Sequence, residues 1–384
     1  MTKAFISGNE AFAHGVRLSR PAVISAYPIT PQTIVVERLS EMVANGELDS
    51  EFMHVESEHS AMSCAIGASA AGVRTFTATS SQGLLYMAEC LPYAAGGRFP
   101  IVMMNADRSI ALPWNIYGDQ SDSTSQISSG WIQAYATNAQ EALDMAIMAY
   151  RIAEDPLVST PFMVNLDGFN LTHTYENVDI PDQEQVDRYL PPYVTDNRLN
   201  MDRPVNMGFS AGPAYNTLFK MSQHRGMMNA ADVVPKAERE FAEIFGRRYS
   251  GATEGYLLDD AEYVIVTLGC ISGLCMDVAR DLREKGIRTG VLRIRYLRPF
   301  PEEEIISMLK DAKAICVLEK DISFGNAGVV FTEVRSALHG IPCSVCNRIA
   351  GLGGRDISRY DIERTFLELE NGPRDVRFIG GDAE

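Results

Sequence analysis

The chain has 384 residues, of which 46% are hydrophobic and 22% are charged, and its formal net charge is −16. A chain of this length exceeds what one hydrophobic core usually supports, so we expect two domains. The acidic balance disfavours nucleic acid as a partner, because phosphate backbones are bound by clustered Lys and Arg. Since the sequence shows neither a secretory start nor a long apolar run, we expect a cytoplasmic protein with no membrane role.

The first 170 residues alternate short apolar segments with helical stretches, the pattern of a parallel sheet covered on both faces. Helices are predicted over residues 31–45, where Pro31 suits a helix start, and over residues 138–155. Strands are predicted over residues 23–27, 52–57, 74–79, 101–106 and 162–166.

Residues 172–229 are rich in Pro, Asn and Asp and lose all periodicity, so we interpret them as a long connecting arm. A helix is predicted over residues 231–245, and a second alternation of strands and helices begins near residue 260. Its strands are predicted over residues 263–268, 289–294, 314–318 and 344–349. The expected fold is therefore α/β throughout, with a first domain over residues 1–245 that includes the arm and a second over residues 246–384.

The seven cysteines are an odd number in apolar surroundings, which indicates reduced, buried thiols. Cys343 and Cys346 have ligand-like spacing, but one such pair supplies half the thiolates of a four-cysteine site. The chain lacks a ferredoxin-type cysteine run, so we expect it to hold no iron–sulfur cluster by itself. The glycines at 325–328 and 351–354 do not complete a dinucleotide fingerprint, so we interpret them as turns.

Polar residues follow four predicted strands of the first domain: Tyr27 to Thr33, Glu56 to His59, Thr79 to Gly83 and Asn105 to Arg108. Ligands of open parallel sheets bind at the carboxyl ends of the strands, where helix N-termini aim N–H groups at one crevice. The four clusters are therefore predicted to converge on one rim.

The segments YPITPQT, VESEHSAM, GASAAG, FTATSSQGL and LPWNIYGDQSDS occur in this order along the first domain. Together with RTGVLRIRYLRPFP and ISFGNAGVVFTEVRSAL, they make nearly the whole chain resemble the alpha subunit of pyruvate:ferredoxin oxidoreductases, in the 2-oxoacid:ferredoxin oxidoreductase family. The resemblance implies a doubly wound parallel-sheet domain that binds the pyrimidine of thiamine diphosphate. A transketolase C-terminal-like α/β domain would follow it.

Glu58 is the predicted catalytic residue. It would begin a helix over residues 58–71, where the helix dipole favours a carboxylate. The resemblance implies that it bonds a pyrimidine nitrogen and so activates the cofactor. Alternatively it is a capping acid, and strand periodicity cannot separate it from Glu56. His59 beside it is a relay or merely a packed residue.

Thr30 and Arg108 are the predicted substrate pair, because Arg matches carboxylate geometry and the Thr hydroxyl adds an orienting bond. The resemblance assigns both to the 2-oxoacid carboxylate. Arg108 could instead pair with Asp107, Asp119 or Asp122 in a surface network. The predicted cofactor contacts, besides Glu58, are Tyr27, Pro28, Ile29, Ser81, Gln82 and Gly83, although Ser81 would also suit a helix cap.

The resemblance implies oxidative decarboxylation of pyruvate with coenzyme A to acetyl-CoA, carbon dioxide and reduced ferredoxin, in anaerobic metabolism. The family's Gly-Asp-Gly signature for the diphosphate is missing here, and no metal ligand is predicted in this chain. The diphosphate and magnesium would therefore belong to a beta subunit that shares the thiamine diphosphate, and [4Fe-4S] clusters to gamma and delta-type subunits of a hetero-oligomer. LDGFNLTH is similar to branched-chain members, so a branched-chain or aryl 2-oxoacid stays open. So do a non-catalytic scaffold role and non-oxidative decarboxylation.

Overall fold

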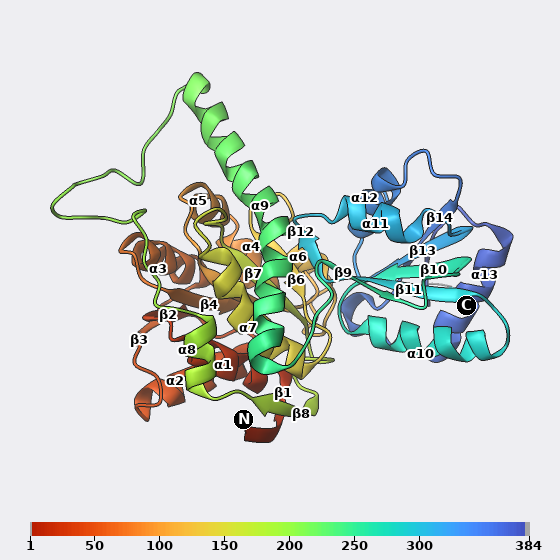
Figure 1. The fold of residues 1–384 in the computed structure, drawn as a ribbon, viewed down its shortest axis with the longest axis horizontal. Helices are drawn as coiled ribbons and strands as arrows, with labels where there is room; N and C mark the ends of the chain where they lie inside the picture. The colour runs from red at the N-terminus through yellow and green to blue at the C-terminus, as the bar shows by residue number, and fades with distance from the viewer. Residues whose placement is uncertain (1, 381–384) are drawn as a thin grey trace.

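A computed structural model describes residues 2–380 and has two α/β units side by side (Figure 1). The first is built on a seven-stranded sheet in which β2 to β7 run parallel and β12 pairs antiparallel with β6. In spatial order its strands are β12 (Tyr296–Arg298), β6 (Ile132–Tyr135), β7 (Phe162–Asp167), β5 (Val102–Asp107), β4 (Thr75–Thr79), β2 (Val23–Ala26) and β3 (Glu51–His54).

Both faces of this sheet are covered, because successive side chains of its central strands point to opposite sides. On β5, Val102 and Met104 enter one hydrophobic cluster and Met103 enters another. The first cluster contains α1 (Gly8–Ser19), α2 (Thr33–Ala44) and α7 (Ala139–Ala153), and the second contains α3 (Glu58–Ala70), α4 (Ser81–Met87) and α5 (Leu91–Gly96). The predicted two-sided parallel sheet is confirmed.

The second unit has a six-stranded sheet that is parallel except for β9 at its edge. In spatial order its strands are β15 (Val376–Phe378), β14 (Ser344–Ile349), β13 (Ala314–Glu319), β10 (Tyr263–Thr267), β11 (Thr289–Ile294) and β9 (Thr253–Tyr256). One face packs on α11 (Glu302–Leu309) and α12 (Val329–Ala337), and the other on α10 (Ile271–Glu284) and α13 (Arg359–Glu368). Two short 3₁₀ helices, η1 (Leu352–Gly354) and η2 (Leu369–Asn371), complete it.

The prediction of an irregular arm over residues 172–229 is wrong at both ends. Strand β8 (Tyr175–Ile180) pairs with β1 (Thr2–Ser7), and α8 (Gln183–Tyr189) follows it. Helix α9 (Pro213–Phe245) begins much earlier than residue 231, and its first half projects from the body beyond a long loop (Figure 1). That first half is largely exposed, so its sequence lacks the one-sided apolar stripe from which a helix is usually predicted.

The two units are joined by strand pairing and by buried charges. Strand β12 follows β11 of the second unit in sequence, yet it adds to β6 of the first. On the adjoining β11, the Arg293 guanidinium binds both carboxylate oxygens of Glu141 at 2.7 Å. Arg295 bridges Glu141 at 2.9 Å and Glu238 at 2.5 Å. Over residues 2–380 no helix is long and apolar enough to cross a membrane.

Candidate cofactor and substrate site

The predicted rim forms at the carboxyl ends of β3, β2, β4 and β5, which are neighbours in the sheet. After each of these strands the chain turns into the polar segment that the sequence singles out. The turn after β4 leads directly into α4, and α3 begins four residues after β3. Two helix N-termini and the loop after β5 therefore approach one another at this edge.

Glu58 is the first residue of α3, and only 8% of its surface is exposed. Ser57 caps the helix, because its hydroxyl accepts a hydrogen bond from the Ser60 N–H. The Glu58 carboxylate is therefore not the capping group. It lies against Gly83, where an added Cβ would come within 2.7 Å of Glu58 Oε1. Glu56 is exposed and accepts a bond from the Ser60 hydroxyl. The structure thus separates the two glutamates that periodicity could not.

Arg108 follows β5, and its side chain is directed across the rim. It is 5% exposed. Its Nη1 donates to the Thr30 carbonyl at 2.7 Å, its Nε to the Asn115 carbonyl at 3.2 Å and its Nη2 to Gln82 Oε1 at 3.4 Å. A guanidinium has five N–H donors, so these three bonds leave two for a ligand.

The Glu58 carboxylate acts electrostatically on Arg108. Burial lowers the pKa of Arg108, while the carboxylates of Asp122 and Glu58 act in the opposite direction. The guanidinium also lies over the Trp114 ring, 5.7 Å from its centroid. The sequence left open a surface network between Arg108 and nearby aspartates. The side-chain bonds of Arg108 go instead to Thr30, Gln82 and Asn115.

The remaining predicted contacts lie around these two residues. Tyr27, Pro28 and Thr30 are exposed, and Ile29 is half-buried. Thr30 approaches Arg108 through its carbonyl, a contact that a hydroxyl-based prediction does not foresee. Ser81 is buried, and its hydroxyl oxygen lies 2.7 Å from Gln82 Oε1 and 2.6 Å from the Ser109 carbonyl oxygen, either of which can accept its one proton.

His59 is turned away from Glu58 toward α4. Its Nε2 lies 3.5 Å from the Glu89 carboxylate, and its ring centroid is 5.8 Å from that of Tyr86. These contacts agree with the alternative that His59 is a packed residue rather than a proton relay.

The loop between Arg108 and α6 (Ser121–Thr124) forms an outer wall, and the second unit holds it. Trp114 on this loop is 68% exposed. Asn115 donates to the Gly353 carbonyl at 2.8 Å, and the Gly353 N–H donates to Asp119 Oδ2 at 2.8 Å. Gly354 has a φ of 78°, and a Cβ there would come 2.4 Å from Tyr117 Cβ. The glycines at 351–354 therefore form a turn, as predicted, and this turn contacts the loop between Arg108 and α6.

A buried polar layer lies beneath the rim and is made of Asn105, Asp107, Asp122, Asp167 and Lys320. The sequence points to Asn105 and Asp107 at a strand end but not to the layer as a whole. Lys320 Nζ binds Asp167 Oδ1 at 2.9 Å. Burial alone raises the pKa of Asp167, but Lys320 and the Cys270 bonds outweigh it, so that this pKa is lowered. Polar residues at strand ends were a signal for this layer, but its bonds join segments more than 100 residues apart.

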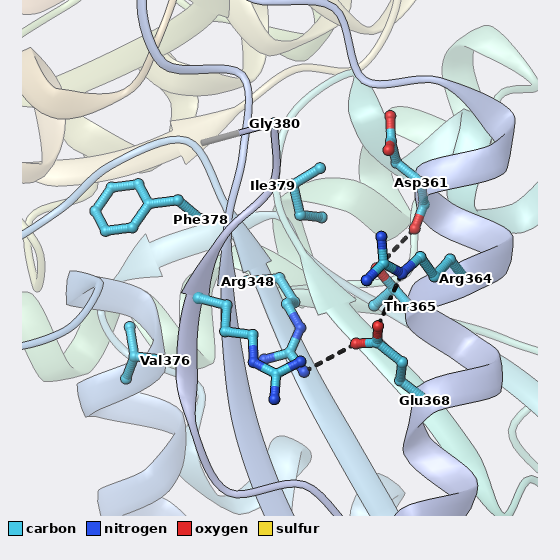
Figure 2. A pocket seen from close by; sticks show the side chains of 10 residues that line it. Arg348, Asp361, Arg364, Thr365, Glu368, Val376, Phe378, Ile379 and Gly380 are labelled. Carbon is cyan, nitrogen blue, oxygen red and sulfur yellow. Dashed lines mark hydrogen bonds and ion pairs between the residues drawn. The ribbon is translucent and has the colours of Figure 1, made fainter. Parts of the chain in front are cut away.

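The cysteines and the second unit offer no competing centre among residues 2–380. All seven cysteines are free thiols, and no group of three or more His, Cys, Asp or Glu could hold a metal. A cavity of about 510 Å³ lies beside β14, β15 and α13, lined in part by Arg348 and Arg364 (Figure 2). Both arginines are paired with Glu368, at 3.1 and 3.0 Å, and Asp375 pairs with Arg348 and with the third lining arginine, Arg377, so each cation of this cavity already has a carboxylate partner.

The fold and the rim together define a thiamine-diphosphate-binding class of α/β protein. Two family models match the chain: "Pyruvate flavodoxin/ferredoxin oxidoreductase, thiamine diP-bdg" over residues 14–239, and "Pyruvate:ferredoxin oxidoreductase core domain II" over residues 261–362. The chain belongs to the pyruvate flavodoxin/ferredoxin oxidoreductase family.

Among curated relatives, pyruvate synthase subunit PorA of Methanothermobacter thermautotrophicus is 46% identical over 99% of this chain and 98% of its own. PorA of Pyrococcus abyssi is 48% identical over 98% of each chain. Ketoisovalerate oxidoreductase subunit VorA of Pyrococcus abyssi is 44% identical over 96% of this chain and 93% of its own. The predicted family is confirmed.

Two solved structures share the fold. The 2-oxoglutarate:ferredoxin oxidoreductase from Magnetococcus marinus matches with a TM-score of 0.74 at 19% identity, over 95% of this chain and 65% of its own. A split gene transketolase matches with a TM-score of 0.54 at 11% identity, over 96% of this chain and 99% of its own. The transketolase-like architecture expected from the sequence is confirmed.

Proposed function

We propose that this chain is the thiamine-pyrimidine-binding subunit of a 2-oxoacid:ferredoxin oxidoreductase that acts on pyruvate. Its family membership and the pyruvate synthase names of relatives at 46–48% identity support the reaction. The observation that carries the site assignment is the buried Glu58, which is held against Gly83 and whose charge favours the charged form of Arg108.

The proposed reaction converts pyruvate and coenzyme A into acetyl-CoA, carbon dioxide, two electrons and one proton. The bond between the carboxylate and the carbonyl carbon breaks, and a thioester bond to sulfur forms. Pyruvate is oxidised, and ferredoxin, as a one-electron carrier, is reduced twice.

The residues of the rim fit a thiamine pyrimidine. Glycine at position 83 lets the Glu58 carboxylate pack directly against the backbone of α4, because an added Cβ would overlap Glu58 Oε1 and Thr79 Oγ1. Gln82 adds a buried Nε2 to which the described residues offer no acceptor, so a donor is available at the same edge. When bound, thiamine diphosphate supplies the carbon nucleophile that attacks the 2-oxo group and accepts the electron pair released with carbon dioxide.

Glu58 would hold a proton at a pyrimidine nitrogen, a role for which a carboxyl group shielded from water is suited. Arg108 would bind the substrate carboxylate with its two remaining N–H donors. The bonds to Thr30, Gln82 and Asn115 fix the plane of the guanidinium beforehand, so little side-chain freedom is lost on binding. Thr30 would line the same side of the pocket.

The partners are proposed from what this chain lacks. A beta subunit would bind the diphosphate through magnesium, and gamma and delta-type subunits would carry [4Fe-4S] clusters that pass electrons to ferredoxin. The first unit presents only a rim, so a facing chain would close the pocket.

A second candidate is the same chemistry on a branched-chain 2-oxoacid, which the VorA relatives at 43–44% identity favour. Reduction of a viologen dye by the anaerobically purified complex, with coenzyme A and a panel of 2-oxoacids, separates the two. A higher kcat/KM for pyruvate than for 2-oxoisovalerate supports the first proposal, and the reverse order replaces it.

The role of Glu58 is tested by Glu58→Gln, with Glu56→Gln as the matched control two residues away on the exposed side. Loss of the acid is expected to lower kcat at least 100-fold, the range of acid–base contributions, whereas Glu56→Gln should stay within about twofold. Near-normal turnover by Glu58→Gln would favour the scaffold alternative.

A further inference from the structure

Asp122 lies in α6, directly beneath the rim, and its side chain is fully buried. Its Oδ2 accepts the backbone N–H of Ser81 at 2.8 Å and the backbone N–H of Arg108 at 3.1 Å. One oxygen atom thus joins the turn that begins α4 to the residue that follows β5. These two segments carry the proposed cofactor and substrate contacts.

The Ser81 backbone needs such a partner. Its φ of 49° lies in the left-handed region, which is strained for a residue other than glycine. The conformation points the N–H of Ser81 at Asp122 and leads the chain into Gly83, against which Glu58 packs. Without an acceptor at Asp122, a buried N–H would be left unpaired in a strained turn.

The wider bonding favours the ionised form of Asp122 over that of its neighbour Asp107. The Asn105 amide donates to Asp122 Oδ2 at 3.2 Å and to Asp107 Oδ1 at 2.8 Å, and the Ser123 N–H donates to Asp122 Oδ1 at 2.8 Å. Asp122 therefore receives four N–H donors, which favour its ionised form. Burial acts against them and raises the pKa of Asp122 to about 7. Burial and the neighbouring carboxylates of Asp122 and Asp167 raise the pKa of Asp107, so Asp107 takes the proton.

We propose that Asp122 is a positioning residue of the 2-oxoacid site, acting through the backbones of Arg108 and Ser81. This inference rests on the proposed function. Asp122 touches neither substrate nor cofactor; it fixes where the Arg108 side chain starts, whereas Glu58 is carried by α3, which is capped by Ser57. Its loss should therefore weaken substrate binding rather than remove the chemistry.

The test uses Asp122→Asn in the anaerobically assembled complex, with steady-state turnover on pyruvate. An amide has one acceptor atom and two donors, so it cannot receive all four N–H groups. The expected result is a KM for pyruvate raised about 30- to 100-fold, the scale of a misplacement near 1 Å, with kcat reduced less than tenfold.

Asp144→Asn is the matched control, since Asp144 is also fully buried but is bonded to Arg247 and Tyr249 away from the rim. It should lower the melting temperature and leave the KM for pyruvate unchanged. If Asp122→Asn likewise lowers only the melting temperature, the proposal is overturned.

A double-mutant cycle with Arg108→Ala tests whether Asp122 affects the KM for pyruvate through Arg108. Arg108→Ala alone should raise the KM for pyruvate, and adding Asp122→Asn should then change it less than about threefold. Additive effects would show that Asp122 does not act through Arg108. An unchanged KM in Arg108→Ala would instead remove the proposed substrate role of Arg108, and the positioning proposal with it.

Asp122→Glu serves if the Asn variant does not assemble. It keeps the charge but moves the carboxylate oxygens by one methylene. A raised KM with a retained kcat supports the proposal, and an unchanged KM overturns it.

Discussion

Gly83→Ala is the most specific perturbation of the site, because it adds one methyl group between two groups that are already in contact with the glycine. The new Cβ would lie 2.5 Å from Thr79 Oγ1 and 2.7 Å from Glu58 Oε1, whereas ordinary contacts begin at 3.4 Å. To restore ordinary contacts, Thr79 Oγ1 would have to move by about 0.9 Å and Glu58 Oε1 by about 0.7 Å, the differences between these distances. Thr79 is held in the central strand β4, so Glu58 has to yield.

The expected result is a kcat lowered about 10- to 100-fold, since a displacement near 1 Å has an effect of this size on a positioned group. Overpacking costs about 1–3 kcal/mol, partly offset by the gain of about 1 kcal/mol when alanine replaces glycine in a helix. The free energy of unfolding should thus change by less than about 2 kcal/mol. Activity should fall much more than stability.

Gly67→Ala is the control, because Gly67 lies within α3 and a Cβ there meets no atom within 4 Å. It should raise the melting temperature slightly and leave turnover unchanged. Both variants are assayed as assembled complexes by pyruvate-dependent dye reduction under anaerobic conditions. If Gly83→Ala turns over within twofold of Gly67→Ala, Glu58 does not need the space at Gly83, and the pyrimidine site is wrongly placed.

Gly354→Ala should raise the KM for pyruvate several-fold, because its Cβ would overlap Tyr117 and release the loop that bonds Arg108; an unchanged KM would show that the loop is held elsewhere. Arg295→Met should lower the free energy of unfolding by about 3–5 kcal/mol by stranding buried carboxylates, whereas Arg280→Met on the surface should change it by less than about 0.5 kcal/mol in denaturant titrations. Burial alone would raise the pKa of Glu141, but Arg293 and Arg295 outweigh it and lower this pKa to about 2. The stability from this carboxylate is complete above its unfolded pKa of about 4.3 and is lost as the pH falls toward 2, so the cost of Arg295→Met should be larger at pH 7 than at pH 4.

The parallel strands could be predicted because each is a short apolar run between turn residues. Strands β11 and β14 have the predicted bounds, and β2, β4, β5, β7, β10 and β13 differ from theirs by one residue at one or both ends. The prediction for β3 extended to residue 57, whereas the strand ends at His54. Period-two reasoning continued through a segment that is no longer a strand, which is why it could not rank Glu56 against Glu58.

Other parts depend on contacts between distant segments, which local patterns do not encode. Strand β6 has only four residues, with the polar Gln133 buried among them, and its partner β12 comes more than 150 residues later. The bonds of Asp122 were likewise hidden, since three of its four donors are backbone N–H groups, and every residue type except proline has one. The domain boundary at residues 245 and 246 stays a prediction.

Strand β12 follows β11 of the second unit in sequence but completes the sheet of the first, and this limits how the protein can be shortened. A fragment that ends after α9 would keep the first sheet but leave β6 as an uncovered edge, with unpaired N–H and C=O groups open to aggregation. The same cut would remove the cations that neutralise Glu141 and Glu238. Work on the cofactor rim alone therefore requires residues up to at least Arg298, or a synthetic strand supplied in their place.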